Sequence, residues 1–313
     1  GETVDGKYRS ELTNEWIDDS LKNQRPIAAM VDNESIALPH YGLSKADVVY
    51  EMMNSTENGR ITRFMALFKD YESIDQIGSI RSVRPTNVIL SAEWNAVLCH
   101  DGGPFYIEEY LAEPSTDHFS GTFSRVDNGK PREYTEYILA GDMDNNFEKS
   151  KVDREYNSYY EGPHYLFADE KNPVDLSAST DAVDASLVDL PFPHNGSYLE
   201  YDADAQVYNY FEYGKAHLDP GNDDKQMAFK NLLIQSCGFT QYDENGYMIF
   251  DCIGEGGGYY VTNGKAIPVT WEKKSMTEPT RYYDANGAEI SLNTGKTYVA
   301  LVPVDDWTDL VIE

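Results

Sequence analysis

The stretch that decides the fold is RPIAAMVDN, residues 25–33. Five apolar residues follow Pro26 without a break, and the polar pair Asp32 and Asn33 ends the run. A short apolar run bounded by proline and polar residues is typical of a strand that is buried on both faces. We therefore predict a buried strand over residues 27–31, at the start of the folded part of the chain.

Strands and helices alternate on the carboxyl side of this strand. The pattern predicts a central strand at residues 61–68, a helix at 84–95, a second buried strand at 96–99 and a helix around 107–111. Pro85 suits the first position of a helix. Residues 42–53 predict a short helix because Ser44 can cap it, although the Val48-Val49-Tyr50 run also fits a strand. The alternation indicates mixed α/β layers.

The last third of the chain carries β signals instead. Strand-like runs occur at residues 207–213, 232–239, 247–253, 259–269, 280–283 and 298–304. Asn-Gly pairs, such as Asn263-Gly264, supply the positive φ angles of tight hairpins, so the pattern predicts a small antiparallel sheet or barrel-like sandwich. The glycine-rich run at 254–258 predicts a bulged hairpin rather than a phosphate loop, since it lacks the helix and lysine that would hold phosphate.

Together these patterns predict an α+β protein of two domains, in line with a length of 313 residues. The fold class is a mixed α/β amino-terminal domain followed by a small, mainly antiparallel β carboxy-terminal domain. The expected parts are a tether at residues 1–24, the first domain at 25–170, a connecting segment at 171–204 and the second domain at 205–313. Residues 142–204 read as loop, because acidic residues, Asn, Ser and Pro predominate there.

The net charge of the chain restricts the binding partners that we expect. The chain has 25 Lys and Arg against 54 Asp and Glu, a net charge of −29. Such a surface repels phosphate polymers and anionic lipid headgroups, so we expect no nucleic-acid partner. No stretch approaches the roughly 18 apolar residues that span a bilayer, so we expect a soluble chain.

Cysteine and histidine patterns predict neither a metal site nor a cofactor. Cys99, Cys237 and Cys252 form no C-x-x-C pair, and the six histidines are scattered without a zinc-binding motif, although distant residues could still build a site. Cys237 and Cys252 both lie in strand-like runs. A disulfide between them stays open beside the default expectation of buried free thiols.

Four cationic or titratable side chains lie within or beside apolar elements of this otherwise acidic first domain. They are Arg63, Arg81, Arg84 and His100. A buried charge requires a partner of opposite sign. The carboxylates that could supply it are Asp32, Glu51 and Asp101. Two interpretations follow, a buried salt-bridge network or a pocket for an anionic or polyhydroxylated ligand.

His100 adds a third interpretation. It ends a predicted strand before Gly102 and Gly103, where backbone N–H groups at a helix start could also hold an anion. An imidazole exchanges protons near neutral pH, so His100 or His164 with one of the same carboxylates could serve a hydrolase. The sequence leaves open whether the protein is an enzyme.

Ordered segments through nearly the whole chain resemble the YerB-like lipoproteins of Gram-positive-type bacteria. They are residues 25–33, 42–51, 61–64 and 77–85, His100 with Gly102 and Gly103, Gly162-Pro163-His164 after Arg154, and residues 254–260, 264–265, 271–273, 282–284 and 292–297. The chain departs from the family pattern over residues 142–160, where the family is more basic. The lipid-bearing cysteine of the family is also absent from the chain.

The resemblance implies a location rather than a chemistry. It implies a lipoprotein displayed outside the membrane, anchored by lipid alone, with an unknown activity. It also adds Arg154 and His164 to the candidate ligand-binding residues. We therefore expect a binding or assembly module whose partner is a cell-envelope component or an envelope protein.

Overall fold

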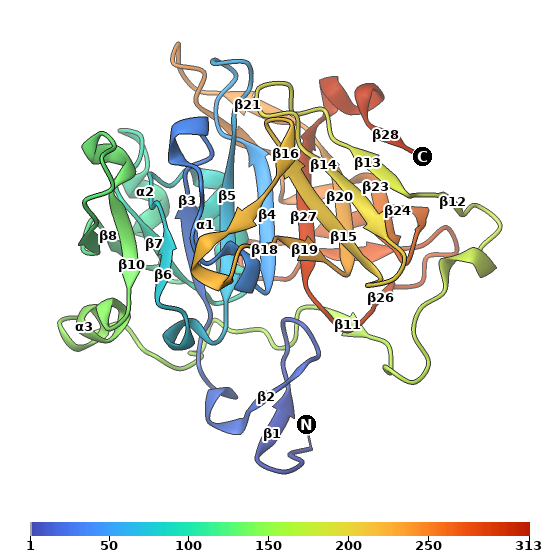
Figure 1. Cartoon of the computed structure of the whole chain (residues 1–313), viewed down its shortest axis with the longest axis horizontal. Coiled ribbons are helices and arrows are strands. Elements are labelled where there is room, and N and C mark those ends of the chain that lie inside the picture. The colour runs from blue at the N-terminus through green and yellow to red at the C-terminus, as the bar shows by residue number, and fades with distance from the viewer. Residues whose placement is uncertain (1) are drawn as a thin grey trace.

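A computed structural model describes residues 2–313, which form mostly strands and few helices. Its main feature is a central sheet of 11 strands (Figure 1). In spatial order the strands are β12 (Val183–Asp184), β24 (Lys265–Lys273), β23 (Gly254–Thr262), β20 (Asn231–Cys237), β27 (Thr297–Pro303), β4 (Val48–Met53), β5 (Thr62–Phe68), β3 (Ile27–Val31), β7 (Val97–His100) and β8 (Asp117–Ser120), with β25 (Arg281–Tyr283) paired to β24.

This sheet spans both predicted domains. Strands β27 and β4 are parallel neighbours, with Thr297 opposite Val48 and Leu301 opposite Met52. On its other side β27 pairs with β20, again in parallel. A strand from the end of the chain thus joins strands from its first sixth in one hydrogen-bonded layer. The domain boundaries given above stay a prediction.

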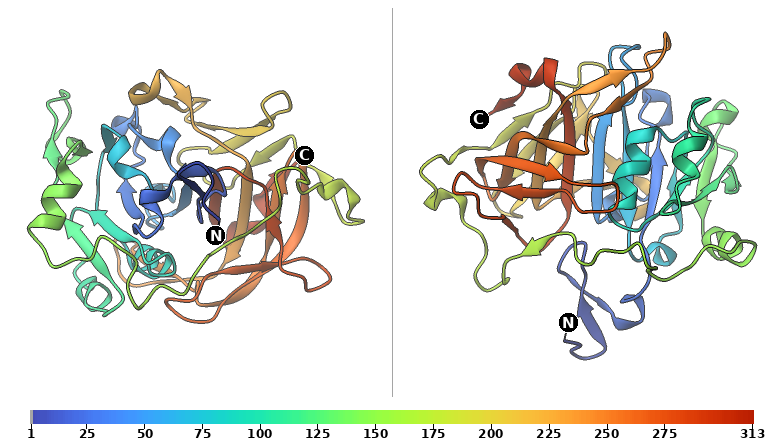
Figure 2. Two further views of the ribbon diagram at one scale, coloured as in Figure 1. Left: turned by 90° about the horizontal axis from the view of Figure 1, so that it is seen from below. Right: turned by 180° about the vertical axis from the view of Figure 1, so that it is seen from behind.

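Smaller elements cover the two faces of the central sheet (Figure 2). One face carries the helices α1 (Pro85–Ala92) and α2 (Glu108–Leu111) and the hairpin β21 (Phe239–Gln241) and β22 (Met248–Phe250). The opposite face carries a six-stranded sheet, β16 (Lys215–Ala216), β15 (Val207–Glu212), β14 (Tyr198–Asp202), β13 (Leu187–Asp189) and β28 (Val311–Ile312), with β19 (Ala228–Phe229). It also carries β6 (Gln76–Gly78), β10 (Glu136–Leu139), β9 (Ser124–Arg125) and α3 (Asp142–Glu148).

The remaining strands form two-stranded ladders. They are β1 (Lys7–Arg9) with β2 (Trp16–Asp18), β11 (Leu166–Phe167) with β26 (Ser291–Leu292), and β17 (Leu218–Asp219) with β18 (Lys225–Gln226). The first ladder lies in the predicted tether, where Leu12 is fully buried. That segment therefore has regular structure which its sequence pattern did not indicate.

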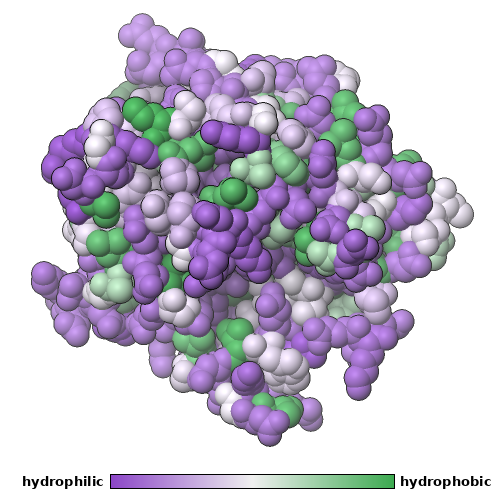
Figure 3. Space-filling view, viewed as in Figure 1, coloured by the Kyte–Doolittle hydropathy of each residue, from purple (hydrophilic) through white to green (hydrophobic). Residues whose placement is uncertain are grey.

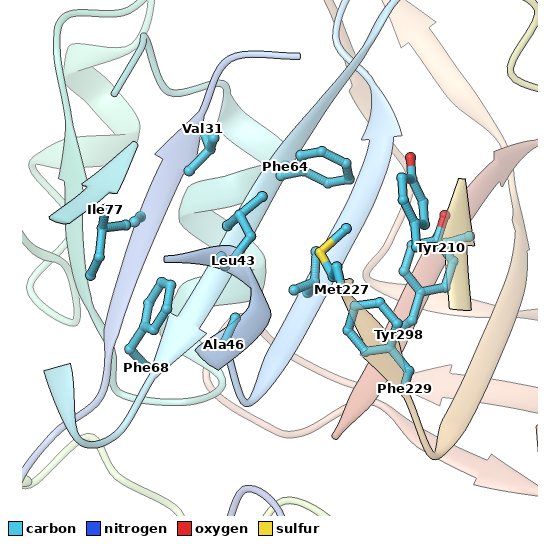
Figure 4. Close-up of a cluster of buried hydrophobic side chains, with 14 of the residues drawn as sticks. Val31, Leu43, Ala46, Phe64, Phe68, Ile77, Tyr210, Met227, Phe229 and Tyr298 are labelled. Atoms are coloured by element: carbon cyan, nitrogen blue, oxygen red, sulfur yellow. The ribbon is translucent and has the colours of Figure 1, made fainter. Parts of the chain in front are cut away.

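One hydrophobic core continues across the two halves of the chain. Figure 4 shows Phe64 of β5 close to Tyr210 of β15, and the two rings meet edge to face with centroids 5.7 Å apart. Tyr298 of β27, in the central sheet, contacts Tyr210 and Phe229 of the six-stranded sheet. Because these aromatic contacts join both halves, the two halves stabilise each other.

Most strands predicted from apolar runs are present. The predictions of β3, β5 and β7 are confirmed, as are the helices α1 and α2. Helix α1 begins at Pro85, and the side chain of Asn87 accepts a hydrogen bond from the Arg84 backbone N–H at 3.0 Å. Asn263 and Gly264, with φ of 50° and 80°, form the turn between β23 and β24 as predicted.

Three predictions about local structure are wrong. Residues 42–53 contain only one 3-10 turn, Leu43–Lys45, before strand β4, whose six residues are all buried between β5 and β27. The helix interpretation is therefore wrong and the strand alternative for residues 48–50 is confirmed, because sheet pairing outweighs the local helical spacing. Residues 142–204 are not all loop, because α3 and four strands lie there. The third error concerns the glycine run at 254–258, which is the first part of strand β23.

Close packing explains these glycines. A Cβ atom on Gly258 would lie 2.2 Å from the carbonyl oxygen of Ile234 on the neighbouring strand. A Cβ atom on Gly256 would lie 2.6 Å from the indole nitrogen of Trp271. The run thus makes room for backbone and a buried ring rather than for phosphate.

The surface is largely hydrophilic. Figure 3 shows polar side chains over most of one face, with hydrophobic ones scattered among them. Within residues 2–313, no helix has the length and apolar character needed to cross a membrane.

Candidate functional site

Three of the predicted cations meet at one hollow. Arg63, Arg81 and Arg84 line a pocket of about 550 Å³ together with Asp32, and we call this the arginine pocket. Val31, the last residue of β3, pairs with Phe64, so Asp32, which follows the strand, lies beside Arg63 of β5. The structure thus brings three of the four predicted side chains to one hollow, and His100 is not among the residues that line it.

The segment between β6 and α1 supplies the other two arginines. Ile80 forms a bridge with Val31, and the Arg81 backbone N–H donates to the Met30 carbonyl at 3.0 Å. These contacts hold Arg81 against the end of β3. Arg84 follows three residues later as the N-cap of α1.

Two carboxylates balance this group directly, Asp32 and Glu133, and Glu133 lies 3.4 Å from Arg81 Nη1. Arg81 Nε lies 2.8 Å from Asp32 Oδ2, and Arg63 lies 4.0 Å from the same oxygen. Glu34, Glu57 and Glu244 also line the pocket. Among residues 2–313, however, none of these three forms an ion pair with the three arginines.

Burial leaves the inner two guanidinium groups short of partners. Arg63 and Arg84 are 9% and 8% exposed. In the described part of the chain, the Nε atoms of both have no hydrogen-bond partner. Burial, with the nearby positive charge of Arg84, lowers the pKa of Arg63 to about 9, although Asp32 partly opposes this shift. The pocket therefore combines three positive charges with few carboxylate partners, which favours a negatively charged ligand.

An aromatic side chain from the other half of the chain completes the wall. The guanidinium of Arg84 lies 4.4 Å from the ring centre of Tyr247, beside the β21–β22 hairpin. Tyr134 covers Arg81 in the same way at 5.5 Å. Sequence reasoning missed both tyrosines, since Tyr247 is far from the arginines in the chain and no motif links them.

A second hollow adjoins the arginine pocket through Arg81. It measures about 390 Å³, and Asp101, Arg125 and Arg132 line it with Arg81. Arg125 lies 3.4 Å from Asp101. We call it the Asp101 hollow. Because Arg81 lines both spaces, it lies between Asp32 on one side and the Asp101 hollow on the other.

Two of the predicted residues lie outside the arginine pocket in buried contacts. His100 contacts the Gly102 carbonyl oxygen at 2.8 Å and His118 at 2.9 Å, and burial lowers its pKa to about 4. Glu51 accepts hydrogen bonds from Thr62, Tyr210 and other donors beneath the six-stranded sheet, and burial raises its pKa. Both side chains are thus committed to internal networks.

Arg154 and His164 lie elsewhere. Arg154 is an exposed residue that pairs with Asp144 at 2.5 Å. His164 is buried, stacks on Trp94 with ring centres 3.7 Å apart and lies 2.8 Å from Glu93.

Glu93 also binds Lys273, at 3.0 Å. Burial alone would raise the pKa of Glu93, but Lys273 and His164 outweigh it and lower the pKa to about 2. This arrangement is a structural ion network. Among the residues described, His100 and His164 therefore share no open cleft with Asp32, Glu51 or Asp101, and the hydrolase interpretation gains no geometric support.

The three cysteines are buried free thiols. Burial raises the pKa of Cys252 to about 12, so this thiol stays protonated at neutral pH. The structure therefore agrees with the default expectation for Cys237 and Cys252 rather than with a disulfide.

The fold and the pocket define a class of protein, an α+β chain built on one mixed sheet with an arginine-lined hollow at the ends of its inner strands β3 and β5. Two family models match it, "Protein of unknown function (DUF3048) N-terminal domain" over residues 12–153 and the corresponding C-terminal domain over residues 188–299. The chain belongs to this DUF3048 family.

A sequence relative and a solved structure agree with this assignment. The chain is 25% identical over 320 residues to the "Putative lipoprotein YerB" of Bacillus subtilis (strain 168), covering 97% of this chain and 86% of the relative. It also resembles the crystal structure of YerB protein from Bacillus subtilis, with a TM-score of 0.82 and 24% identity, covering 98% of this chain and all of that one. The resemblance read from the sequence is confirmed.

Proposed function

We propose that this chain is an extracytoplasmic binding or assembly module of the bacterial cell envelope, held by lipid to the outer face of the membrane. Its arginine pocket binds an acidic or polyhydroxylated envelope component, or carboxylates of an envelope protein. The lipoprotein name of the Bacillus relative supports the location. The net charge of −29 argues against a nucleic-acid partner.

One observation carries the binding proposal. Two nearly buried guanidinium groups, those of Arg63 and Arg84, line a shared hollow, and within the described chain their one ion pair is the 4.0 Å approach of Arg63 to Asp32. A purely structural network would pair such groups, because an unsatisfied buried charge costs several kcal/mol. A ligand anion in the hollow would supply the missing negative charge.

The rest of the lining favours a ligand that carries hydroxyl groups as well. Asn54, Asn58 and Asn245 bring amides to the pocket, and Glu34 and Glu57 bring carboxylates. These groups can accept or donate hydrogen bonds to hydroxyls, while the arginines take the anion. A phosphorylated polyol or an acidic sugar has both features.

Calorimetric titration with glycerol 3-phosphate, glucuronate and inorganic phosphate tests this proposal. We expect the wild-type chain to bind at least one of the three probes. Each of the variants Arg81→Met and Arg84→Met should weaken binding by about 10-fold or more, because a hydrogen bond to a charged group contributes roughly 1.5–3 kcal/mol. Lysine at either position should restore part of the affinity, since it keeps the charge but not the planar fork.

Arg154→Met is the matched control, because that arginine lies on the surface outside the pocket. It should leave probe binding unchanged. Melting curves followed by circular dichroism separate binding from folding. Equal affinities in wild type and both pocket variants would overturn the proposal, and variants that fail to fold, lysine ones included, would favour the salt-bridge interpretation.

A further inference from the structure

Two histidines and a glutamate that are far apart in the sequence meet inside the molecule, away from the arginine pocket. They are His40, His217 and Glu212, and one possible ligand atom of each lies within 4.8 Å of the others. All three side chains are buried, with exposed fractions of 0%, 4% and 1%. Two imidazoles and a carboxylate are a ligand set that zinc and similar first-row ions prefer.

The β15–β16 hairpin places two of the three residues. Tyr213 and Gly214 form its turn with φ of 52° and 72°. The His217 backbone N–H donates to the Tyr210 carbonyl at 3.2 Å, so His217 follows the ladder opposite Tyr210. Tyr210 and Glu212 are two residues apart on β15 and share its buried face. Glu212 and His217 therefore point to the same side of the sheet.

The loop after β3 supplies the third residue. His40 Nδ1 lies 2.7 Å from His217 Nε2. The other nitrogen of His40, Nε2, lies 2.5 Å from the Asp32 carbonyl oxygen and must donate a proton to it. This contact leaves Nδ1 with its lone pair directed at the cluster. A backbone carbonyl that fixes the tautomer in this way is the usual second contact of a metal-bound histidine.

Glu212 is oriented by one of its oxygens and has the other left over. Its Oε2 accepts hydrogen bonds from Asn33, Asn195 and Tyr210 at 2.8, 3.1 and 3.2 Å. Its Oε1 is buried and has no hydrogen-bond partner within residues 2–313. Such an atom is costly without a donor or a cation.

A hollow beside Lys215 reaches two of the three residues from the surface. Glu212 and His217 line a pocket of about 300 Å³, together with residues such as Leu38, Pro39 and Leu218. An ion could enter by this route. With three protein ligands, a tetrahedral ion keeps a fourth position for water or another donor, which is the arrangement of an accessible rather than a closed site.

We propose that His40, His217 and Glu212 form a binding site for one divalent first-row metal ion, with Zn²⁺ as the best match. The ion takes the place of the proton that the two ring nitrogens share. His217 then carries its proton on Nδ1, and any proton on Glu212 passes to solvent. Tetrahedral zinc with bonds of about 2.0–2.1 Å separates two ligand atoms by roughly 3.3 Å, so the two rings move apart slightly and the carboxylate approaches.

Titration of chelator-treated, full-length protein tests the site. We expect one Zn²⁺ per chain by calorimetry, and one Co²⁺ per chain with the visible absorption of a tetrahedral complex. Zn²⁺ should also raise the melting temperature, since an ion that binds only the folded state stabilises it. The variants His217→Gln and Glu212→Gln should each lose at least about 100-fold in affinity, more than the usual loss from a second-contact mutation.

His194→Gln is the matched control, because His194 lies near the carboxylate of Glu34, at 3.3 Å, but outside the cluster. It should bind like the wild type. X-ray absorption of the zinc-loaded wild type should show two imidazole ligands, a result that needs no variant to fold. Absence of stoichiometric binding, unchanged affinity in His217→Gln, or a metal shell without imidazole would each overturn the proposal.

Discussion

Glu136 shows how a single buried carboxyl group responds to its neighbours. It lies on β10, beneath the Asp101 hollow, and is 1% exposed. Burial, together with a hydrogen bond to Asp101 and the charge of Asp101, raises the pKa of Glu136 from about 4.5 to about 8. Glu136 is therefore protonated at neutral pH and can donate to Asp101.

This shift predicts a pH dependence of stability. The unfolded chain releases the Glu136 proton near pH 4.5, while the folded chain keeps it to about pH 8. The stabilisation is thus fully present below pH 4.5 and is lost as the pH rises through 8. We expect Glu136→Gln to lack this loss and to gain about 2 kcal/mol relative to wild type between pH 5 and 9, a value reduced for screening.

Urea unfolding at several pH values measures the difference in free energy of unfolding between Glu136→Gln and wild type. Groups that titrate alike in both proteins cancel in this difference. Asp101→Asn removes the partner carboxylate and should flatten the wild-type slope in part. Parallel pH profiles for wild type and Glu136→Gln would contradict the assignment.

At the scale of elements, the glycine run in β23 predicts opposite outcomes for adjacent substitutions. Gly258→Ala would place a methyl group 2.2 Å from the Ile234 carbonyl oxygen, so strands β23 and β20 must separate. Nothing lies within 4 Å of the same position at Gly257. We expect Gly258→Ala to destabilise the fold by about 2–4 kcal/mol and Gly257→Ala to change it by less than about 0.5 kcal/mol.

Chemical unfolding of the two variants beside wild type provides the measurement. Gly257→Ala serves as the matched control for Gly258→Ala, because both changes add the same methyl group to the same strand. Equal stabilities for the two variants would show that β23 does not approach β20 as closely as described.

The same scale shows where sequence patterns are sufficient. Apolar runs such as residues 27–31 predicted strands because burial on both faces leaves a local signature. For strand β4 the sequence left helix and strand both open, because the deciding environment comes from β27, about 250 residues later, which no local pattern records. The glycines of β23 were misread for a similar reason, since the atoms that exclude a Cβ lie on other strands.

The candidate site divides in the same way. The sequence indicated Arg63, Arg81 and Arg84 because a charged residue within an apolar segment is unusual, wherever its partners lie in the chain. Tyr247 and the His40–His217 pair could not be found, because these contacts join segments that lie far apart in the chain. Long-range pairing is a property of the fold, and a single sequence carries little trace of it.

At the scale of the whole molecule, the shared sheet makes a prediction about fragments. Residues 1–170 alone would expose the edge of β4 that β27 covers, and would also lose the aromatic contacts of Tyr210. We expect this fragment to bind a hydrophobic dye and to melt without a cooperative transition, while the full chain melts in one. Calorimetry and circular dichroism measure both. A fragment that melts cooperatively near the temperature of the full chain would show that the first half is independent.

The position of β27 has a consequence for biosynthesis. A ribosome releases residues 48–53 long before residues 297–303, yet these two strands are neighbours in the finished sheet. Until translation is nearly complete, the apolar edge of β4 has no partner strand. It can then pair with other nascent chains. This mispairing would be avoided if the chain stayed unfolded until its last strand is available. Transport through a secretion channel keeps a chain unfolded in this way.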